Sequence, residues 1–461
     1  MNADDESNET ADSFHPLGEE WENDLEAMLD DTEYDTELGM EMAQDAMRVT
    51  KGELSEADFH EKYHEDMMAE FGQDDRPTEA ALEEMESDDD GGLGRVLEAF
   101  DGDGEVDRRE VIKKMGAGAA FLGLGAAATV DDSEPSVDAG PAQGGADDEG
   151  VQWGMVLDLE TCDGCLSCVE ACADENQLDS GVNWMYVLDW EDPTEQLETG
   201  RQRLIRPCQH CTDAPCEKVC PTTARHTRQS DGLVLTDYEV CIGCRYCQVA
   251  CPYGVNYFQW MEPEVPEGAI EDQHIYDDRD RPVDSRAPRG VMSKCTFCPT
   301  RQDGHEGEDM IGSTACEDAC PPEAIQFGDM NDPESAPRQY VDNPPLGRAR
   351  AMAADDDDDL QEAIDIIDGE TEPDGMSEQE AQAMIAEFGG AADSTFKLLE
   401  EIGTNPNVVY IGNQPGPNAE QIEGPIQYDE LSYVSNDDET IRLADVRKEV
   451  TDEGTVGGNL L

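Results

Sequence analysis

Sixteen cysteines, the full complement of the chain, fall into four groups of four between positions 162 and 320. The third group has the most regular spacing: Cys241, Cys244 and Cys247 lie three apart, and Cys251 follows directly before Pro252. Bacterial ferredoxins bind [4Fe-4S] clusters with this run, because three closely spaced thiolates reach three irons of one cubane while the fourth cysteine ligates a neighbouring cluster. The proline lacks an N–H and helps the chain to turn away.

The other three groups are variations on this spacing. The first is followed by Ala173, whereas the second and fourth are followed by Pro221 and Pro321. Four groups of four thiolates match the ligand demand of four [4Fe-4S] clusters. The predicted ligands are all sixteen cysteines: Cys162, Cys165, Cys168, Cys172, Cys208, Cys211, Cys216, Cys220, Cys241, Cys244, Cys247, Cys251, Cys295, Cys298, Cys316 and Cys320.

Structural zinc and a disulfide framework are the alternatives for a chain with many Cys-x-x-Cys pairs. Zinc requires neither the triplet spacing nor the proline after the last cysteine. Disulfide scaffolds are normally small, whereas this chain has 461 residues. The spacing therefore favours iron–sulfur clusters.

The chain carries 111 acidic and 29 basic residues, which gives a formal net charge of −82. An acidic tail for a basic partner is one explanation. The acidity extends through all regions, however, and this favours adaptation to concentrated salt, where a hydrated acidic surface keeps proteins soluble. Direct binding of nucleic acid is not expected, since it needs basic patches. The sequence contains no run of about 18 apolar residues, so no membrane span is predicted.

Residues 1–106 are predicted to form an acidic, partly helical N-terminal extension without a catalytic motif. Apolar residues at helical spacing predict helices over 21–28 and 53–71. His60 and His64 lie four apart and could share a metal ion. A histidine pair without a third ligand is more simply a solvated helix face, which is the interpretation we favour.

Residues 107–130 resemble a twin-arginine export signal. Arg108 and Arg109 precede Val111, Ile112 and a mildly apolar, Gly/Ala-rich run. The pathway exports folded proteins with their cofactors, so we expect location on the outer face of the cell membrane, with a cytoplasmic location as the alternative. About a hundred residues precede the pair, which is unusual for such a signal. Residues 101–110 also suggest the calcium-binding loop of an EF-hand. Neither of the two possible alignments puts suitable residues at all the required positions of that loop, so calcium binding is not expected.

The rest of the chain divides by composition. A linker over 131–150 precedes a four-cluster ferredoxin-like domain over 151–345, with an acidic insertion over 346–393 that we interpret as a solvated arm. Residues 394–412, read as an amphipathic helix and a strand, return to the domain, and 413–461 form a polar tail. The predicted fold class is α+β, with two intertwined ferredoxin-like modules. Strands are expected over 153–159, 182–190, 223–228, 233–237, 255–260 and 324–327.

From residue 153 to 412 the chain resembles the four-cluster iron–sulfur subunit of the dimethyl-sulfoxide/polysulfide reductase family. The motifs that carry this resemblance are Cys208-Gln-His-Cys211, Ala214-Pro-Cys216, Cys241-Ile-Gly-Cys-Arg-Tyr-Cys247, Ala250-Cys-Pro-Tyr-Gly254, Lys294-Cys-Thr-Phe-Cys298, Gly328-Asp-Met-Asn-Asp-Pro333 and Gly403-Thr-x-Pro406. The resemblance does not extend to the first 106 residues. It implies a non-catalytic electron-transfer subunit of anaerobic respiration that links a quinone-reactive integral membrane subunit to a molybdopterin oxidoreductase catalytic subunit.

The resemblance also implies that cysteine groups exchange their last ligand, the first with the fourth and the second with the third; ferredoxin geometry leads to the same expectation. We expect a peripheral membrane protein held by protein contacts. The alternatives are the iron–sulfur subunit of another quinol-oxidising complex and an autonomous polyferredoxin. Arg245 and Lys294 either raise nearby reduction potentials or pair with surface carboxylates, and His210 either tunes the second group or packs.

Overall fold

The structure is a computed structural model. It describes residues 13–16, 18–74, 76, 150–179, 182–191, 202–263, 287–353, 358–369, 376–389, 394–416 and 419–423. The twin-arginine segment, the calcium-loop candidate and the linker up to residue 149 lie outside these ranges. Among the described helices, none is long and apolar enough to cross a bilayer.

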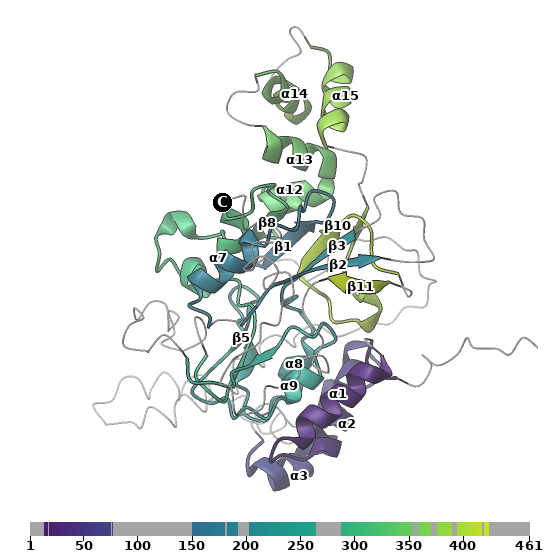
Figure 1. The fold of residues 1–461 in the computed structure, drawn as a ribbon, viewed down its shortest axis with the longest axis vertical. Coiled ribbons are helices and arrows are strands. Elements are labelled where there is room, and N and C mark those ends of the chain that lie inside the picture. The colour runs from purple at the N-terminus through teal and green to yellow at the C-terminus, as the bar shows by residue number, and fades with distance from the viewer. Residues whose placement is uncertain are drawn as a thin grey trace, which may run out of the picture.

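The central sheet has the strand order β8-β1-β10-β9, with bounds Ile325–Asp329, Trp153–Asp158, Val408–Ile411 and Thr395–Phe396. Strand β1 runs parallel to β10 and antiparallel to β8. All six residues of β1 are buried, which explains its nearly continuous apolar sequence. The sheet thus joins the start, middle and end of the domain (Figure 1).

A second sheet has the order β11-β2-β3, with bounds Glu420–Glu423, Tyr186–Glu191 and Gln202–Arg206. Two small antiparallel pairs complete the strands: β4–β5 and β6–β7, with bounds Arg225–Thr227, Val234–Thr236, Tyr257–Phe258 and Met292–Ser293. Each of the six predicted strands is present, as β1, β2, β4, β5, β6 and β8, although β2, β4 and β6 are at least three residues shorter than predicted. The sequence analysis missed β3, because arginines interrupt its alternation.

Short helices follow the cysteine loops: α7 (Ser167–Glu175), α8 (Pro215–Lys218), α9 (Tyr246–Val249) and α11 (Ala315–Asp318). Two more turns, α10 (Pro299–Gln302) and η3 (Glu308–Met310), lie inside the fourth group, and α12 (Ala336–Asp342) packs on β8 and β1. The predicted alternation of strand, cysteine loop and short helix is therefore present.

Three N-terminal helices, α1 (Glu19–Asp30), α2 (Thr36–Thr50) and α3 (Glu56–Phe71), form a layer beside α8 and α9, and α2 packs directly against both (Figure 1). Side chains of Asp35 and Ser55 cap α2 and α3. The sequence predicted α1 and α3 but missed α2. The prediction that the histidine pair lies on a solvated helix face is wrong for His60. This residue is 2% exposed, because it lies on the buried face of α3. His64 lies 3.0 Å from Asp74.

The insertion forms a helical unit beyond the central sheet: α13 (Pro344–Met352), α14 (Asp358–Asp368) and α15 (Glu378–Gly389) (Figure 1). Its core includes Leu360, Ile364 and Ile385, so the prediction of a solvated arm is wrong. The predicted amphipathic helix after residue 394 is also wrong. That segment forms β9 and the turn η4 (Glu400–Ile402), since pairing of Phe396 with Tyr410 at the sheet edge outweighs helical spacing.

Candidate iron–sulfur sites

The fold collects the sixteen cysteines into four quartets. Each quartet takes three thiols from one sequence group and the last thiol of a partner group. Quartet A holds Cys162, Cys165, Cys168 and Cys320, and quartet B holds Cys295, Cys298, Cys316 and Cys172. Quartet C holds Cys208, Cys211, Cys216 and Cys251, and quartet D holds Cys241, Cys244, Cys247 and Cys220. The first group thus exchanges with the fourth, and the second with the third.

Two quartets surround measurable cavities. The four thiols of quartet D line one cavity, and those of quartet B line another. Across the described ranges, no three His, Cys, Asp or Glu side chains converge closely enough to hold a single metal ion. None of the sixteen cysteines forms a disulfide. Four thiols around a cavity fit a cubane cluster better than a mononuclear zinc ion, and the disulfide alternative does not match this arrangement.

The thiols are held in an apolar environment. Burial raises the pKa of Cys162, Cys241 and Cys295 to about 11. A thiol with such a pKa is protonated at neutral pH, so iron binding must release its proton. Cluster loading is therefore expected to weaken as the pH falls, and the bound thiolates are shielded from bulk water.

The backbone of the cysteine loops repeats. Gly164 and Gly243, just before the second cysteines of the first and third groups, have φ of 76° and 70°. Leu166 and Arg245, just after those cysteines, have φ of 65° and 67°. Non-glycine residues seldom adopt this left-handed conformation, so its recurrence at equivalent positions marks the two loops as the same structure.

The second and fourth groups share a different loop. His210 and Phe297, each just before the second cysteine, have φ of 42° and 62°. Thr223 and Glu323, three residues after the last cysteines, have φ of 51° and 50°. Each pair of groups that exchange their last cysteine therefore contains one loop of the first kind and one loop of the second kind.

The quartets follow one another in the order A, B, C, D. Cys168 of quartet A acts electrostatically on Cys316 of quartet B, and Cys208 of quartet C acts on Cys295 of quartet B. Cys247 of quartet D acts on Cys216 of quartet C. Quartet A contains an exposed thiol, Cys165, whereas every thiol of quartets B and C is buried. The arrangement is a line with at least one end open to the surface.

Donor groups lie beside several sulfurs. The backbone N–H groups of Arg225 and Ala324 donate to Cys220 Sγ and Cys320 Sγ at 3.4 and 3.3 Å. The N–H of His210 donates to Cys208 Sγ at 3.4 Å. Hydrogen bonds to ligand sulfur stabilise the reduced, more negative state of a cluster and raise its potential.

His210 is completely buried and stacks on Phe297 with ring centroids 3.8 Å apart. Its Nδ1 accepts the N–H of Val234, so Nε2 carries the hydrogen and donates to the carbonyl oxygen of Cys295; both distances are 3.0 Å. Burial and the nearby Lys294 ammonium hold the pKa of His210 well below its usual value. The ring is therefore a neutral link between the second and fourth groups.

Lys294 and Arg245 are both buried. The ammonium of Lys294 donates to the carbonyl oxygens of Val234 and Cys295, so pairing with surface carboxylates is the wrong interpretation for this residue. The guanidinium of Arg245 donates to the carbonyl oxygen of Met28 and lies 4.1 Å from the ring centroid of Phe258. These contacts place positive charge near quartets B and D.

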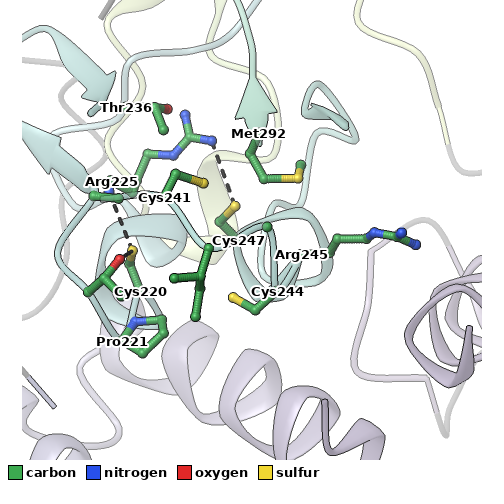
Figure 2. Close-up of a pocket in the computed structure, with 13 residues that line it drawn as sticks. Cys220, Pro221, Arg225, Thr236, Cys241, Cys244, Arg245, Cys247 and Met292 are labelled. Carbon is green, nitrogen blue, oxygen red and sulfur yellow. Dashed lines mark hydrogen bonds between the residues drawn. The ribbon is translucent and has the colours of Figure 1, made fainter. Parts of the chain in front are cut away.

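The sequence interpretation missed two contributors to quartet D. One is the N-terminal segment: Tyr246, which precedes Cys247, donates from its hydroxyl to the carbonyl oxygen of Asp35 at 2.6 Å. The other is Arg225, which lines the cavity (Figure 2). Its place five residues after Cys220 carries no motif that would have marked it.

Comparison with known proteins agrees with this geometry. The "4Fe-4S dicluster domain" family matches residues 202–270, and the family "N-terminal region of 4Fe-4S ferredoxin iron-sulfur binding" matches residues 15–79. The chain is 32% identical to a putative iron-sulfur subunit of dimethyl sulfoxide reductase from Halobacterium salinarum over 316 residues, which cover 66% of this chain and 94% of the relative. The chain belongs to the iron–sulfur electron-transfer subunits of the dimethyl-sulfoxide/polysulfide reductase family.

Two further relatives are similar over less than half of the chain. The menaquinone reductase iron-sulfur cluster-binding subunit of Nitratidesulfovibrio vulgaris is 37% identical over 205 residues, 40% of this chain and 78% of the relative. A selenate reductase subunit of Mesobacillus selenatarsenatis is 38% identical over 206 residues, 43% of this chain and 68% of the relative. The match over residues 15–79 is to a separate ferredoxin family model, which the sequence analysis did not predict for the N-terminal extension.

Proposed function

We propose that this subunit relays single electrons through four [4Fe-4S] clusters, one in each quartet, and catalyses no reaction itself. The relay runs between a quinone-reactive integral membrane subunit and a molybdopterin oxidoreductase catalytic subunit, as part of anaerobic respiration. The observation that carries the proposal is the linear order of the quartets from A to D. Four adjacent sites in one domain form a path, whereas scattered sites would not.

The chain's own residues hold and tune the clusters in this proposal. The sixteen cysteine thiolates supply the ligands, and the clusters accept and donate one electron at a time. The apolar surroundings of quartets B and C exclude water from the middle of the path. Backbone N–H groups beside Cys208, Cys220 and Cys320 favour the reduced state.

Two intertwined ferredoxin-like modules organise the path: quartets A and B form one, and quartets C and D the other. The repeated loop conformations and the exchange of the last cysteine support this division. The proposed domain bounds are 151–345 with a return over 394–412, interrupted by the insertion over 346–393. Residues 1–106, 107–130, 131–150 and 413–461 are proposed as extension, export signal, linker and tail.

Metal analysis of the purified chain tests the cluster proposal. We expect about sixteen iron atoms per chain, four for each quartet. Partial reduction should produce cubane-type EPR signals that interact magnetically, because neighbouring quartets lie close together. Stoichiometric zinc with little iron would overturn the proposal.

The similarity to the menaquinone reductase subunit favours one alternative, namely a place in a quinone-linked complex without a molybdopterin partner. Purification of the native complex separates the two cases. Co-purification of a molybdopterin-containing subunit supports the first proposal, whereas haem subunits without molybdopterin support the alternative. A chain that purifies alone, loaded with iron, would support an autonomous polyferredoxin.

We also propose export by the twin-arginine route and peripheral attachment at the outer face of the membrane. An acidic chain with net charge −82 is repelled by anionic headgroups, so attachment is expected through protein contacts. Changing Arg108 and Arg109 to lysine should leave cluster-loaded protein in the cytoplasm, because the transporter reads the arginine pair. An unchanged distribution would favour the cytoplasmic alternative.

A further inference from the structure

Arg225 is a buried cation beside two quartets. Its side chain is 1% exposed, at the start of β4, and it lines the quartet D cavity with Cys241 and Cys247. Figure 2 shows the guanidinium above this cavity, on the side that faces Met292 and Thr236. The residue is thus enclosed by protein and thiols, with no access to bulk water.

Among the described residues, only some of the N–H donors of the Arg225 guanidinium have a hydrogen-bond partner. Nη2 donates to Asn256 Oδ1 at 2.8 Å and lies 3.7 Å from Cys247 Sγ. Nε and Nη1 are buried and have no hydrogen-bond partner in the described part of the chain. A guanidinium has five N–H donors in a fixed plane, so the donors of these two atoms are left without a protein acceptor among the described residues.

The charge of Arg225 is balanced mainly by thiol sulfur. Burial lowers the pKa of its guanidinium, but the nearby sulfurs of Cys247 in quartet D and of Cys216 and Cys208 in quartet C outweigh this and raise it above its usual value. Two other buried arginines are paired with carboxylates: Arg228 bonds Asp231 and Asp303, and Arg301 bonds Glu175 and Asp318. Arg225 therefore differs from them in what neutralises it.

A buried cation without a carboxylate partner is costly unless another negative group lies against it. A cubane with four thiolates carries net negative charge, and it gains one more negative charge when it is reduced. Its sulfide sulfurs also accept hydrogen bonds. The cavity beside Arg225, lined by four thiols, is where such a group would sit.

We propose that Arg225 sets the reduction potential at this end of the path: its guanidinium, held with Nη2 3.7 Å from Cys247 Sγ, stabilises the reduced cluster of quartet D, and the same charge stabilises reduction of the quartet C cluster. This inference rests on the proposed function. Each transfer moves one electron from a neighbouring cluster, no bond is broken, and Arg225 keeps its proton throughout. Electrons arriving in either cluster are held more tightly than they would be without this residue.

Redox titration of the full chain by EPR tests the proposal, with Arg225→Met, Arg225→Lys and the control Arg228→Lys. In Arg225→Met, the equilibrium constant for reduction should fall at least tenfold at two of the four clusters, which corresponds to about 59 mV for one electron. Arg225→Lys keeps the charge but loses the planar fork, so we expect a smaller fall at the same two clusters. Arg228→Lys should leave all four potentials unchanged.

Pulsed EPR on protein labelled with ¹⁵N-arginine supplies a direct signature. The reduced quartet D cluster should show a nitrogen hyperfine coupling that disappears in Arg225→Lys. Unchanged potentials in Arg225→Met with full iron content, or absence of the coupling, would overturn the proposal. If Arg225→Met fails to load quartet D, unchanged potentials in Arg225→Lys overturn it equally. A wild-type chain without iron would instead refute the proposed function.

Discussion

Replacing Arg348 with methionine should lower the free energy of unfolding by about 3–5 kcal/mol, because it leaves the carboxylate of Asp158 buried without its cation. The two side chains are 4% and 1% exposed. Arg348 Nη2 lies 3.2 Å from Asp158 Oδ1, and its Nη1 donates to the carbonyl oxygen of Gly389 at 2.7 Å. The pair joins the inserted helices to the end of β1.

Asp158 also holds the backbone that leads into the first cysteine loop, at quartet A. Asp158 Oδ1 accepts the N–H of Glu160 at 3.0 Å, and the carbonyl oxygen of Asp158 accepts the N–H of Cys162 at 3.3 Å. Tyr340 donates to Asp158 Oδ2 at 3.0 Å. A displaced carboxylate would therefore loosen the first cysteine loop, and iron should be lost first from quartet A.

Thermal melting, followed by the visible absorbance of the clusters, measures the effect. A loss of 3–5 kcal/mol corresponds to a decrease in Tm of about 6–20 °C, at about 2–4 °C per kcal/mol for a domain of this size. Arg338→Met is the matched control, since among the described residues Arg338 makes a single long, partly exposed pair, with Asp342 at 3.8 Å. We expect that control to cost at most about 1 kcal/mol.

A double variant separates the buried charge from lost packing. Asp158→Asn combined with Arg348→Met removes both charges, so it should be less destabilised than the sum of the two single variants. Strict additivity, or a cost below about 1 kcal/mol for Arg348→Met alone, would refute the reasoning.

Three further predictions concern the quartets and the surface. Cys172→Ser should impair the cluster of quartet B, and Cys320→Ser should impair that of quartet A, as EPR of each variant would reveal. If each substitution instead impaired the cluster bound by the other three cysteines of its own sequence group, the exchange would be contradicted. Gly39→Ala places a Cβ 2.7 Å from the Tyr246 ring, so it should weaken docking of α2 by about 1–3 kcal/mol and speed proteolysis of the N-terminal helices; unchanged cleavage would count against this contact. Transfer from about 1 M salt to about 0.01 M lengthens the Debye length from about 3 to 30 Å, so self-repulsion at net charge −82 should lower the Tm, and a salt-independent Tm would argue against the salt-adapted interpretation.

The sequence alone determined the chemistry of the cysteines. Ligation by Cys241, Cys244 and Cys247 depends on spacings of three residues, which a tight loop satisfies whatever the rest of the chain does. The β4–β5 hairpin was likewise readable, because its turn signal is local. Local geometry also explains why exchange of the last cysteine could be expected before the structure was known.

Only the tertiary structure determined which segments cover the cluster path and which charged side chains lie beside it. His15 lies 3.3 Å from the carbonyl oxygen of Cys251, which is 236 residues away, and Arg348 meets Asp158 across 190 residues. Arg225 lines the quartet D cavity, with Nη2 3.7 Å from Cys247 Sγ, because β4 and the third cysteine loop lie together. Such contacts have no spacing rule in sequence, since they arise when separate elements bury their surfaces against one another and each buried polar group must find its partner there.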